Sequence, residues 1–389
     1  MKSLAFYIIL VISVLTLGSC KNKVESKSTI MTDTTDTLQV LSTDSLLKDS
    51  SIIQNEAKVN SEEVDSLEFD GLEKVIRLTE GINNPKSVVI SPNGRYAYIN
   101  NLEGMNTMII NTETYETESI IEHTGKPVEF GITGKGRYVW ISYFRLLEKG
   151  YPRELGVERN YRYSSVVVVY DTLEKALTKR IDVGIIPKVI AVSPDEKLVL
   201  VANWNSGTLT AINAENYEVI KTIKVGLIPR GVEFTPDGKY VYVCNFGGST
   251  ISVIDALTLE EIKIIKNVGY KPRDIIIRND QSYAYFSTFG DGYLMKLDLE
   301  SDVVVDKIRI GSQPRSICMT HNNNYIFAVN YASASISVID SRTFSKIGTY
   351  QADLGAVGVA LTPDMKYLWV TNQSTGSIIV YKIKYKNND

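Results

Sequence analysis

The chain has 389 residues, of which 44% are hydrophobic and 22% are charged, and its formal net charge is −3. A balance this close to neutral argues against a nucleic-acid-binding protein, which needs a concentrated positive surface. Two histidines and three cysteines, with no Cys-x-x-Cys or His-x-His pattern, argue against a zinc, copper or covalent haem site, so we expect no metal and no cofactor.

The first twenty residues have the pattern of an export signal. Lys2 gives a positive start, and residues 4–17 form a mostly apolar run that is too short for a comfortable membrane span. The segment Leu17-Gly-Ser-Cys20 follows and resembles the lipobox of bacterial lipoproteins. This resemblance implies that Cys20 is lipidated and that residues 1–20 are removed or modified as a signal peptide. The alternative is an ordinary signal peptide with a chance cysteine.

Lipidation at Cys20 would place the protein in a bacterial cell envelope, held to the membrane through the lipid alone. Lys21 follows this cysteine and does not resemble the aspartate that retains lipoproteins in the inner membrane of enteric bacteria. The outer membrane is therefore favoured, with the protein on its periplasmic or surface face.

Residues 21–70 have a different composition from the rest of the chain. They are rich in Ser, Thr, Asp, Glu and Lys, and they contain five lysines against eleven acids. Lys2 is the only charged residue before them, so residues 71–389 carry a net charge of +2. Low hydrophobicity with excess negative charge predicts a disordered tether. A short helix over residues 59–67 is the alternative.

Residues 71–385 contain one sequence pattern repeated seven times. The fourth copy predicts four strands, over residues 232–235, 240–244, 250–254 and 261–265, with a Pro-Asp-Gly turn at 236–238. Steps of 42, 60, 42, 43, 42 and 42 residues separate the anchoring positions, which are Pro85, Pro127, Pro187, Pro229, Pro272, Pro314 and Ala356. A period near forty with four short strands per unit predicts an all-β fold, a seven-bladed β-propeller.

The two ends of the repeat region predict how the ring closes. The seventh copy supplies three strands, over 357–360, 367–371 and 377–382, and the chain ends before an outer strand appears. Residues 72–81 match the outer strand at 217–226. We therefore expect the N-terminal strand, residues 72–80, to pair with the last blade and to remove the open edges of the ring.

The repeats resemble the YVTN family of β-propeller repeats. The resemblance rests on Tyr240-Val-Tyr-Val-Cys-Asn245, on Tyr367-Leu-Trp-Val-Thr-Asn372, and on the Ile-Ser-Val-Ile-Asp runs that end at Asp255 and Asp340. It covers residues 72–384 and implies a protein of the surface-layer, periplasmic or lipoprotein-anchored type. The wider group includes propeller lactonases and quinoprotein-like and haem-binding propellers, so the resemblance alone does not assign an activity.

Three repeat positions predict the chemistry of one face. A cation follows the anchor in five copies: Lys86, Lys188, Arg230, Arg273 and Arg315. Asparagine ends the second strand in five: Asn101, Asn203, Asn245, Asn330 and Asn372. An aromatic residue follows that strand in five: Phe144, Trp204, Phe246, Phe289 and Tyr331. The loops concerned emerge on one face, so a cationic ring and an aromatic ring should surround the same channel mouth.

Each of these positions also has a purely structural explanation. The asparagines would bond loop backbone, the aromatic rings would cap the core between blades, and the cations would pair with neighbouring acids. Five like charges around one opening repel, however, and packing alone does not account for them. We therefore expect an anion-binding mouth.

The step of 60 residues contains an insertion of about eighteen, located between the second and third strands of blade two. It is rich in Arg and Tyr, the residues enriched at binding hot spots, and includes Arg153, Arg159 and Tyr161. Long connections of this kind are usually functional or disordered. We expect a contact loop on the same face as the two rings, against the alternative of a solvated loop.

No pattern indicates a catalytic residue. Asp171, Asp255, Asp298 and Asp340 share one repeat position, where they should initiate turns, and His321 lies in another turn. The sequence therefore favours a monomeric binding module for an envelope protein or an anionic glycan or polymer. The alternative is a lactonase-like propeller enzyme acting on a small ligand in the channel, which would need a singular cluster of acid, His and Arg.

Overall fold

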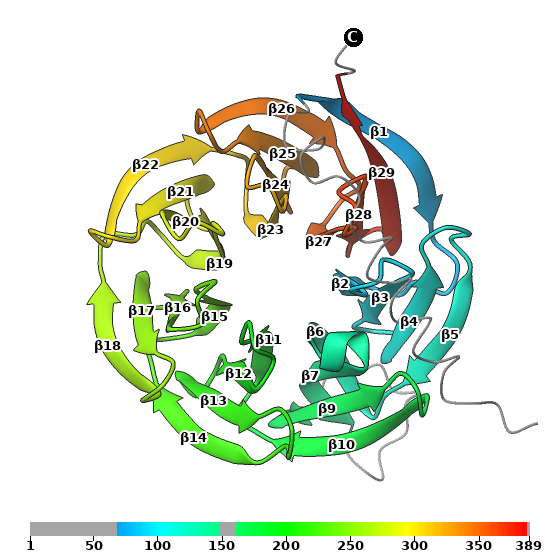
Figure 1. Ribbon diagram of the computed structural model, residues 1–389. Coiled ribbons are helices and arrows are strands. Elements are labelled where there is room, and N and C mark those ends of the chain that lie inside the picture. The colour runs from blue at the N-terminus through cyan, green and yellow to red at the C-terminus, as the bar shows by residue number, and fades with distance from the viewer. Residues whose placement is uncertain (1–67, 148–160, 387–389) are drawn as a thin grey trace, which may run out of the picture. The chain divides into compact units, whose positions relative to one another are not determined.

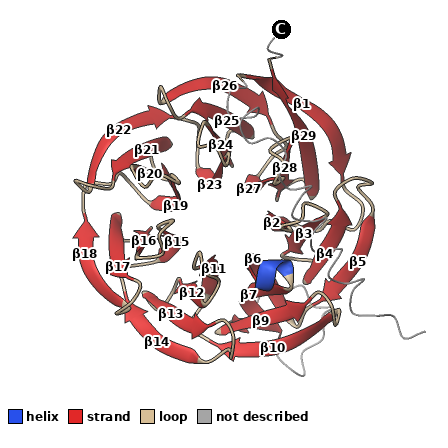
Figure 2. Ribbon diagram, viewed as in Figure 1, coloured by secondary structure: helices blue, strands red, loops and turns tan. Residues whose placement is uncertain are grey.

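The computed structural model describes residues 68–147 and 161–386, in which seven β-sheets form a ring around a central channel (Figure 1). Nearly all of the described elements are strands (Figure 2). The fold is the predicted seven-bladed β-propeller. The predicted signal peptide with Cys20, residues 21–67 of the predicted tether, and Arg153 and Arg159 lie outside the described residues, as does the side chain of Tyr161. Within the ranges described, no helix is long and apolar enough to cross a bilayer.

Each blade is an antiparallel sheet whose first strand lies at the channel and whose last strand lies at the perimeter (Figure 1). Blade one contains β2 (Pro85–Ile90), β3 (Tyr96–Asn101), β4 (Asn106–Asn111) and β5 (Thr117–Glu122). Blade two contains β6 (Gly125–Thr133), the 3₁₀ turn η1 (Gly134–Gly136), β7 (Tyr138–Leu147), β8 (Tyr161–Tyr163), β9 (Val166–Asp171) and β10 (Ala176–Asp182). Blade three contains β11 (Pro187–Val192), β12 (Leu198–Asn203), β13 (Thr208–Asn213) and β14 (Val219–Lys224).

The remaining blades repeat this order. Blade four contains β15 (Pro229–Phe234), β16 (Tyr240–Asn245), β17 (Thr250–Asp255) and β18 (Glu260–Ile265). Blade five contains β19 (Pro272–Ile277), β20 (Tyr283–Thr288), β21 (Tyr293–Asp298) and β22 (Val303–Arg309). Blade six contains β23 (Pro314–Met319), β24 (Tyr325–Asn330), β25 (Ser335–Asp340) and β26 (Ser345–Gln351). Blade seven contains β27 (Ala356–Leu361), β28 (Tyr367–Asn372), β29 (Ser377–Tyr385) and β1 (Phe69–Leu78).

The repeated polar residues form the turns that the sequence predicts. Asp255 Oδ1 accepts hydrogen bonds from the backbone N–H groups of Leu257 and Thr258, at 3.0 and 2.8 Å, so it initiates the turn between β17 and β18. In the turn between β15 and β16, the Thr235 hydroxyl donates to Asp237 Oδ1 at 2.7 Å. Gly238 adopts a φ of 72° there, a conformation that costs glycine little. The shared aspartates are therefore structural.

The ring closes as predicted, because β1 pairs antiparallel with β29 and supplies the outer strand of blade seven. The register places Leu72 opposite Ile383 and Leu78 opposite Ile378. The strand begins three residues earlier than predicted, at Phe69, whose buried ring packs among aromatic residues of blade six. Phe69 and Asp70 therefore belong to the propeller and not to the tether predicted over residues 21–70. Residues more than 250 positions apart thereby hold the ring together.

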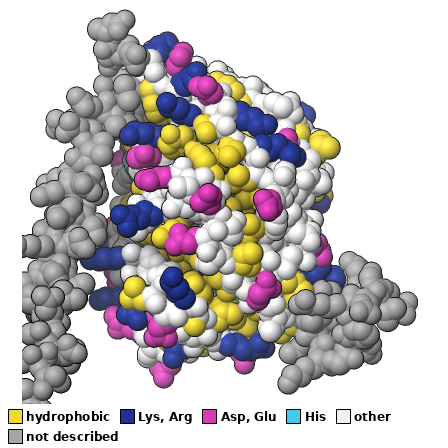
Figure 3. Space-filling model, turned by 90° about the vertical axis from the view of Figure 1, so that its right-hand side faces the viewer, with side chains coloured by type: hydrophobic (Ala, Val, Ile, Leu, Met, Phe, Trp, Pro, Cys, Tyr) yellow, Lys and Arg dark blue, Asp and Glu magenta, His cyan; other side chains and the backbone are white. Residues whose placement is uncertain are grey.

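The hydrophobic core lies between blades rather than within them. One cluster joins Leu200 and Leu209 of blade three to Val232 and Val241 of blade four, and similar clusters fill the other blade interfaces. Each blade therefore depends on its neighbours for burial of its apolar faces. At the perimeter, the side view shows basic and acidic side chains interspersed with apolar ones (Figure 3).

The blade-two insertion has regular structure at its base. β7 continues to Leu147 and pairs with β8, with Arg145 opposite Tyr163. The sequence predicts a loop there, and the structure shows that its stem is a hairpin. Cys244 and Cys318 are free; Cys244 is buried and Cys318 is partly exposed. His321 lies in a turn, as predicted, and is exposed there.

Candidate functional site

A repeated β-bulge shapes the wall of the channel. In the ladder of blade five, Pro272 pairs with Thr288 and the next pair is Ile275 with Phe286, so the inner strand carries one extra residue after its anchor. All seven blades show this shift. A bulge re-aims the side chains around it. Arg273 and Asp274, which are adjacent in sequence, therefore both line the channel.

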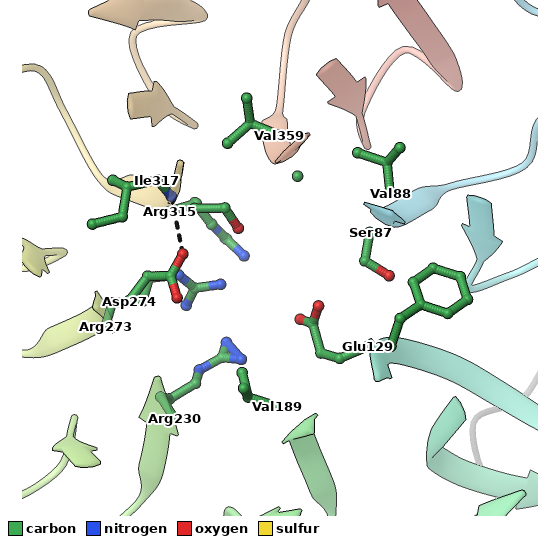
Figure 4. A pocket seen from close by; sticks show the side chains of 13 residues that line it. Ser87, Val88, Glu129, Val189, Arg230, Arg273, Asp274, Arg315, Ile317 and Val359 are labelled. Carbon is green, nitrogen blue, oxygen red and sulfur yellow. Dashed lines mark hydrogen bonds between the residues drawn. The ribbon is translucent and has the colours of Figure 1, made fainter. Parts of the chain in front are cut away.

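The channel contains a cavity of about 160 Å³. Its wall is made by residues of all seven inner strands: Ser87, Val88, Glu129, Phe130, Val189, Arg230, Arg273, Asp274, Arg315, Ser316, Ile317, Gly358 and Val359. Arg230, Arg273 and Arg315, from blades four, five and six, point toward its centre (Figure 4). Glu129 and Ser87 face them from blades two and one (Figure 4). The cavity therefore has an arginine wall, Arg230, Arg273 and Arg315, and an opposing wall, Ser87 and Glu129.

The predicted cationic ring is present, but its side chains are buried or partly buried and are not exposed around the mouth of the channel. Lys86, Lys188 and Arg273 are only 6%, 7% and 7% exposed. Arg230 and Arg315 are partly exposed and line the cavity. The expectation of a ring displayed at the mouth is therefore corrected: three of the cations, Arg230, Arg273 and Arg315, line the cavity. Lys86 pairs with Glu129, and Lys188 lies against Phe144.

Protein carboxylates neutralise little of this positive charge. Lys86 Nζ pairs with Glu129 Oε1 at 3.1 Å. For the arginine wall and Lys188, no ion pair is formed with any residue of 68–147 or 161–386. The Nε atoms of Arg230 and Arg315 are buried without a hydrogen-bond partner in the same ranges. Buried charges of this kind are costly unless a counter-charge is supplied.

The pKa values of these groups reflect that cost. Burial lowers the pKa of Lys86 to about 8, although Glu129 opposes the shift. Burial lowers the pKa of Arg315 to about 10, and the charge of Arg230 adds to this effect. For Arg273, burial followed by repulsion from Arg230 and Arg315 lowers the pKa well below its usual value. An anion bound among the three guanidinium groups would reverse these shifts.

The aromatic ring lies against the cations, as the loop positions predict. Lys188 Nζ is 3.9 Å from the ring centroid of Phe144, and the Arg315 guanidinium is 3.9 Å from that of Tyr331. Longer contacts join Lys188 to Trp204, Arg273 and Arg315 to Phe289, and Lys271 to Phe246. Cation–π contacts of this kind are worth about 0.5–2 kcal/mol. The aromatic faces therefore stabilise cations that lack carboxylate partners.

The asparagine ring is structural. Asn101, Asn203, Asn245, Asn330 and Asn372 are completely buried. Asn245 Nδ2 donates to the hydroxyl groups of Thr250 and Ser252 on the neighbouring strand, at 3.1 and 2.8 Å. Asn203 makes the equivalent bonds. These side chains tie the second strand to the third, so they support the mouth and do not reach the cavity.

Sequence reasoning missed two acids of the channel wall, Glu129 and Asp274. They occupy the second position after the anchor, where the other blades carry Ser87, Val189, Gly231, Ser316 and Gly358. Asp274 Oδ2 accepts a hydrogen bond from the Ile317 N–H at 2.9 Å, and burial raises the pKa of Asp274 to about 6. The sequence did contain a signal for them, because they are the two acids at a repeat position that holds small, polar or apolar residues in the other blades.

Comparison with known proteins supports the fold. A family model described as YNCE-like beta-propeller matches residues 162–329. A solved structure titled Kuenenia stuttgartiensis Hydrazine Synthase is similar at 17% identity with a TM-score of 0.66, covering 82% of this chain and 100% of that chain. The chain is a β-propeller. At this identity the structural likeness concerns the fold alone. No curated protein matches the sequence.

Neither of the two histidines, His123 and His321, lines the cavity. His123 is buried, and its Nδ1 and Nε2 atoms lie 2.9 Å from the Tyr143 hydroxyl and 2.8 Å from the Thr107 hydroxyl. Burial lowers the pKa of His123 to about 3, so the ring is neutral near pH 7. Among the residues that the structure describes, no group of three His, Cys, Asp or Glu side chains is arranged to hold a metal ion.

The stem of the blade-two insertion contributes to the mouth of the propeller. The Arg145 guanidinium lies 5.1 Å from the ring centroid of Phe144 and 5.5 Å from that of Tyr163, and Tyr163 is 55% exposed. Phe144 in turn contacts Lys188. The stem of the predicted contact loop is therefore joined to the cationic ring through shared aromatic contacts.

Proposed function

We propose that this propeller is a binding protein of the bacterial cell envelope that holds an anionic group of its partner against the arginine wall. The observation that carries the proposal is the placement of three guanidinium groups in one cavity without a paired carboxylate in the described ranges. Guanidinium groups bind carboxylates and phosphates through paired, charge-assisted hydrogen bonds. The fold is consistent with a binding or interaction module.

The partner that we propose is an envelope protein or an anionic glycan or polymer. The lipobox-like segment at Cys20 supports a lipid anchor, and the acidic composition of residues 21–67 supports a tether that carries the propeller away from the membrane. The YVTN-like repeats support the surface-layer or lipoprotein type. The net charge of +2 over residues 71–389 makes nucleic acid a poor candidate.

Capture from an envelope extract tests this function. The triple variant Arg230→Ala, Arg273→Ala, Arg315→Ala should lose a partner that the wild-type protein retains, because its binding charges are gone. Lys366→Ala is the matched control, since Lys366 is a surface cation in the seventh blade. Equal capture by the triple variant and the wild-type protein would remove the channel from consideration as the binding site.

One observation favours the second candidate, a lactonase-like enzyme acting in the channel. Glu129 and Asp274 are singular acids placed in the same cavity as the arginine wall, which matches part of the cluster that such an enzyme would need. No histidine lines the cavity. Incubation with γ-butyrolactone, followed by NMR, tests this candidate. Ring opening that Glu129→Gln abolishes would establish catalysis, and an unchanged spectrum would exclude this substrate.

A further inference from the structure

The cavity has different chemistry on its two sides, and this difference defines a ligand class. On one side the arginine wall supplies guanidinium donors from three consecutive blades (Figure 4). On the other side Glu129 supplies a carboxylate (Figure 4). A bound molecule therefore meets three guanidinium donors at one end, with the Asp274 carboxyl group held beside them by the Ile317 N–H, and the Glu129 acceptor at the other end (Figure 4).

The Glu129 carboxylate retains an acceptor for a ligand. Its Oε1 atom accepts a hydrogen bond from Lys86 at 3.1 Å, and its Oε2 atom has no hydrogen-bond partner among the residues described. Ser87 is fixed beside it, because the Ser87 hydroxyl donates to the Val128 carbonyl and accepts from Asn100 Nδ2. A ligand that reaches this side must therefore bring its own hydrogen-bond donor.

The hydrogen-bond donor that the ligand brings to Glu129 should be neutral rather than positively charged. An ammonium group at Glu129 would lie close to the Lys86 ammonium and opposite the three guanidinium groups, which repel it. A hydroxyl group carries no such penalty. Ser316 lines the cavity beside Arg315, and its hydroxyl has no hydrogen-bond partner in the described residues, so it offers a second polar contact for a hydroxylated ligand.

The size of the cavity sets a limit on the ligand. Pockets for drug-sized molecules occupy about 300–1,000 Å³, whereas this cavity is about 160 Å³. A single monosaccharide-sized unit is the largest hydroxylated anion in keeping with that volume. A polymer would therefore place only its terminal unit inside the channel, with the rest outside the mouth.

Resting on the proposed function, we infer that the channel binds one acidic sugar unit, with its carboxylate on Arg230, Arg273 and Arg315 and a hydroxyl group donating to Glu129. The unit is either a free sugar acid or the end of an anionic glycan. Its recognition combines charge from one wall with hydrogen bonding from the other. Neither a plain carboxylic acid nor a neutral sugar satisfies both walls.

Three ring compounds of similar size test this inference by isothermal titration calorimetry on the full chain. D-glucuronate has a carboxylate and hydroxyl groups, cyclohexanecarboxylate lacks the hydroxyl groups, and D-glucose lacks the carboxylate. We expect D-glucuronate to bind about tenfold more tightly than cyclohexanecarboxylate, because a hydrogen bond to a charged acceptor is worth about that factor. D-glucose should show no measurable binding.

The outcomes separate this inference from the proposed function. Equal affinity for the two acids would overturn the acidic-sugar inference and leave anion binding standing. Binding of neither acid would also overturn the acidic-sugar inference, whereas the proposed function falls only if the triple arginine variant captures the partner as well as the wild-type protein does. Methyl β-D-glucuronide distinguishes the two sources: binding equal to that of D-glucuronate supports the end of a glycan, and binding of D-glucuronate alone supports a free sugar acid.

Two variants locate the hydroxyl contact. Glu129→Gln should bring the affinity for D-glucuronate close to that for cyclohexanecarboxylate, because a neutral amide oxygen is a weaker acceptor than a carboxylate oxygen. The amide oxygen can still accept a hydrogen bond from Lys86. Ser316→Ala removes the second polar contact without disturbing a buried charge. This variant therefore tests the hydroxyl contacts if Glu129→Gln fails to fold. An unchanged affinity ratio in both folded variants would refute the placement of the hydroxyl groups.

Discussion

Replacement of Arg273 by methionine should stabilise the protein while abolishing anion binding. Arg273 is buried beside Arg230 and Arg315 and has no ion pair in the described residues. Replacing buried ionic groups by apolar side chains of similar volume is often stabilising by about 1–4 kcal/mol. The lost cation–π contact with Phe289 subtracts about 0.5–1 kcal/mol. We therefore expect a net gain of about 1–2 kcal/mol in the free energy of unfolding.

Urea unfolding followed by tryptophan fluorescence measures this difference in the absence of ligand. Lys239→Met is the control, because Lys239 forms an exposed ion pair with Asp237 at 3.0 Å. Its loss should cost less than about 1 kcal/mol, as surface ion pairs contribute little. A bound anion at one hundred times its dissociation constant should stabilise only the wild-type protein, by about 2.7 kcal/mol. An Arg273→Met protein less stable than the ligand-free wild-type protein would refute the claim that this charge is uncompensated.

Two further predictions concern ring closure and pH. Phe69→Ala should lower the free energy of unfolding by about 3–4 kcal/mol, because it empties the buried contact between β1 and blade six. Val75→Ala on the same strand, at a position 43% exposed, should change it by less than about 0.5 kcal/mol in urea unfolding. Equal effects of the two would contradict the closure argument. Anion affinity, measured by calorimetry between pH 5 and 9, should fall as pH rises through about 6 and again through about 8. Burial raises the pKa of Asp274 to about 6, so Asp274 gains negative charge as pH rises, while Lys86, with a pKa of about 8, loses positive charge. Affinity that rises with pH would show that these groups do not face the anion.

The fold could be predicted from the sequence because of its repeats. The candidate site could be predicted only in part, because the bulge changes which side chains face the channel. The periodic anchors and the match between residues 72–81 and 217–226 predicted seven blades and their closure, because each repeat carries its own strands and turns. The start of β1 at Phe69 depends on contacts with blade six, which no local pattern reveals. The cations were found because five copies share them, and the aromatic residues for the same reason.

Glu129 and Asp274 were missed because averaging over repeats hides residues that occur once. Their inward direction comes from the extra residue of the bulge, which shifts the alternation expected of a regular strand. The same shift moved Arg273 from the expected rim to the buried wall. Burial, and with it the altered pKa values, arises only when seven inner strands meet around one axis.

The bulge after each anchor separates the chemistry of the channel wall from the architecture of the propeller. The extra residue takes part in no regular pairing, so exchanging it leaves the inter-strand ladder of its blade intact. Each blade thus offers the channel an interchangeable side chain, much as loops do in other scaffolds. Proteins with this framework can diversify what they recognise through inner-strand substitutions alone, and the residues at these positions are the ones to compare when sorting its relatives by ligand.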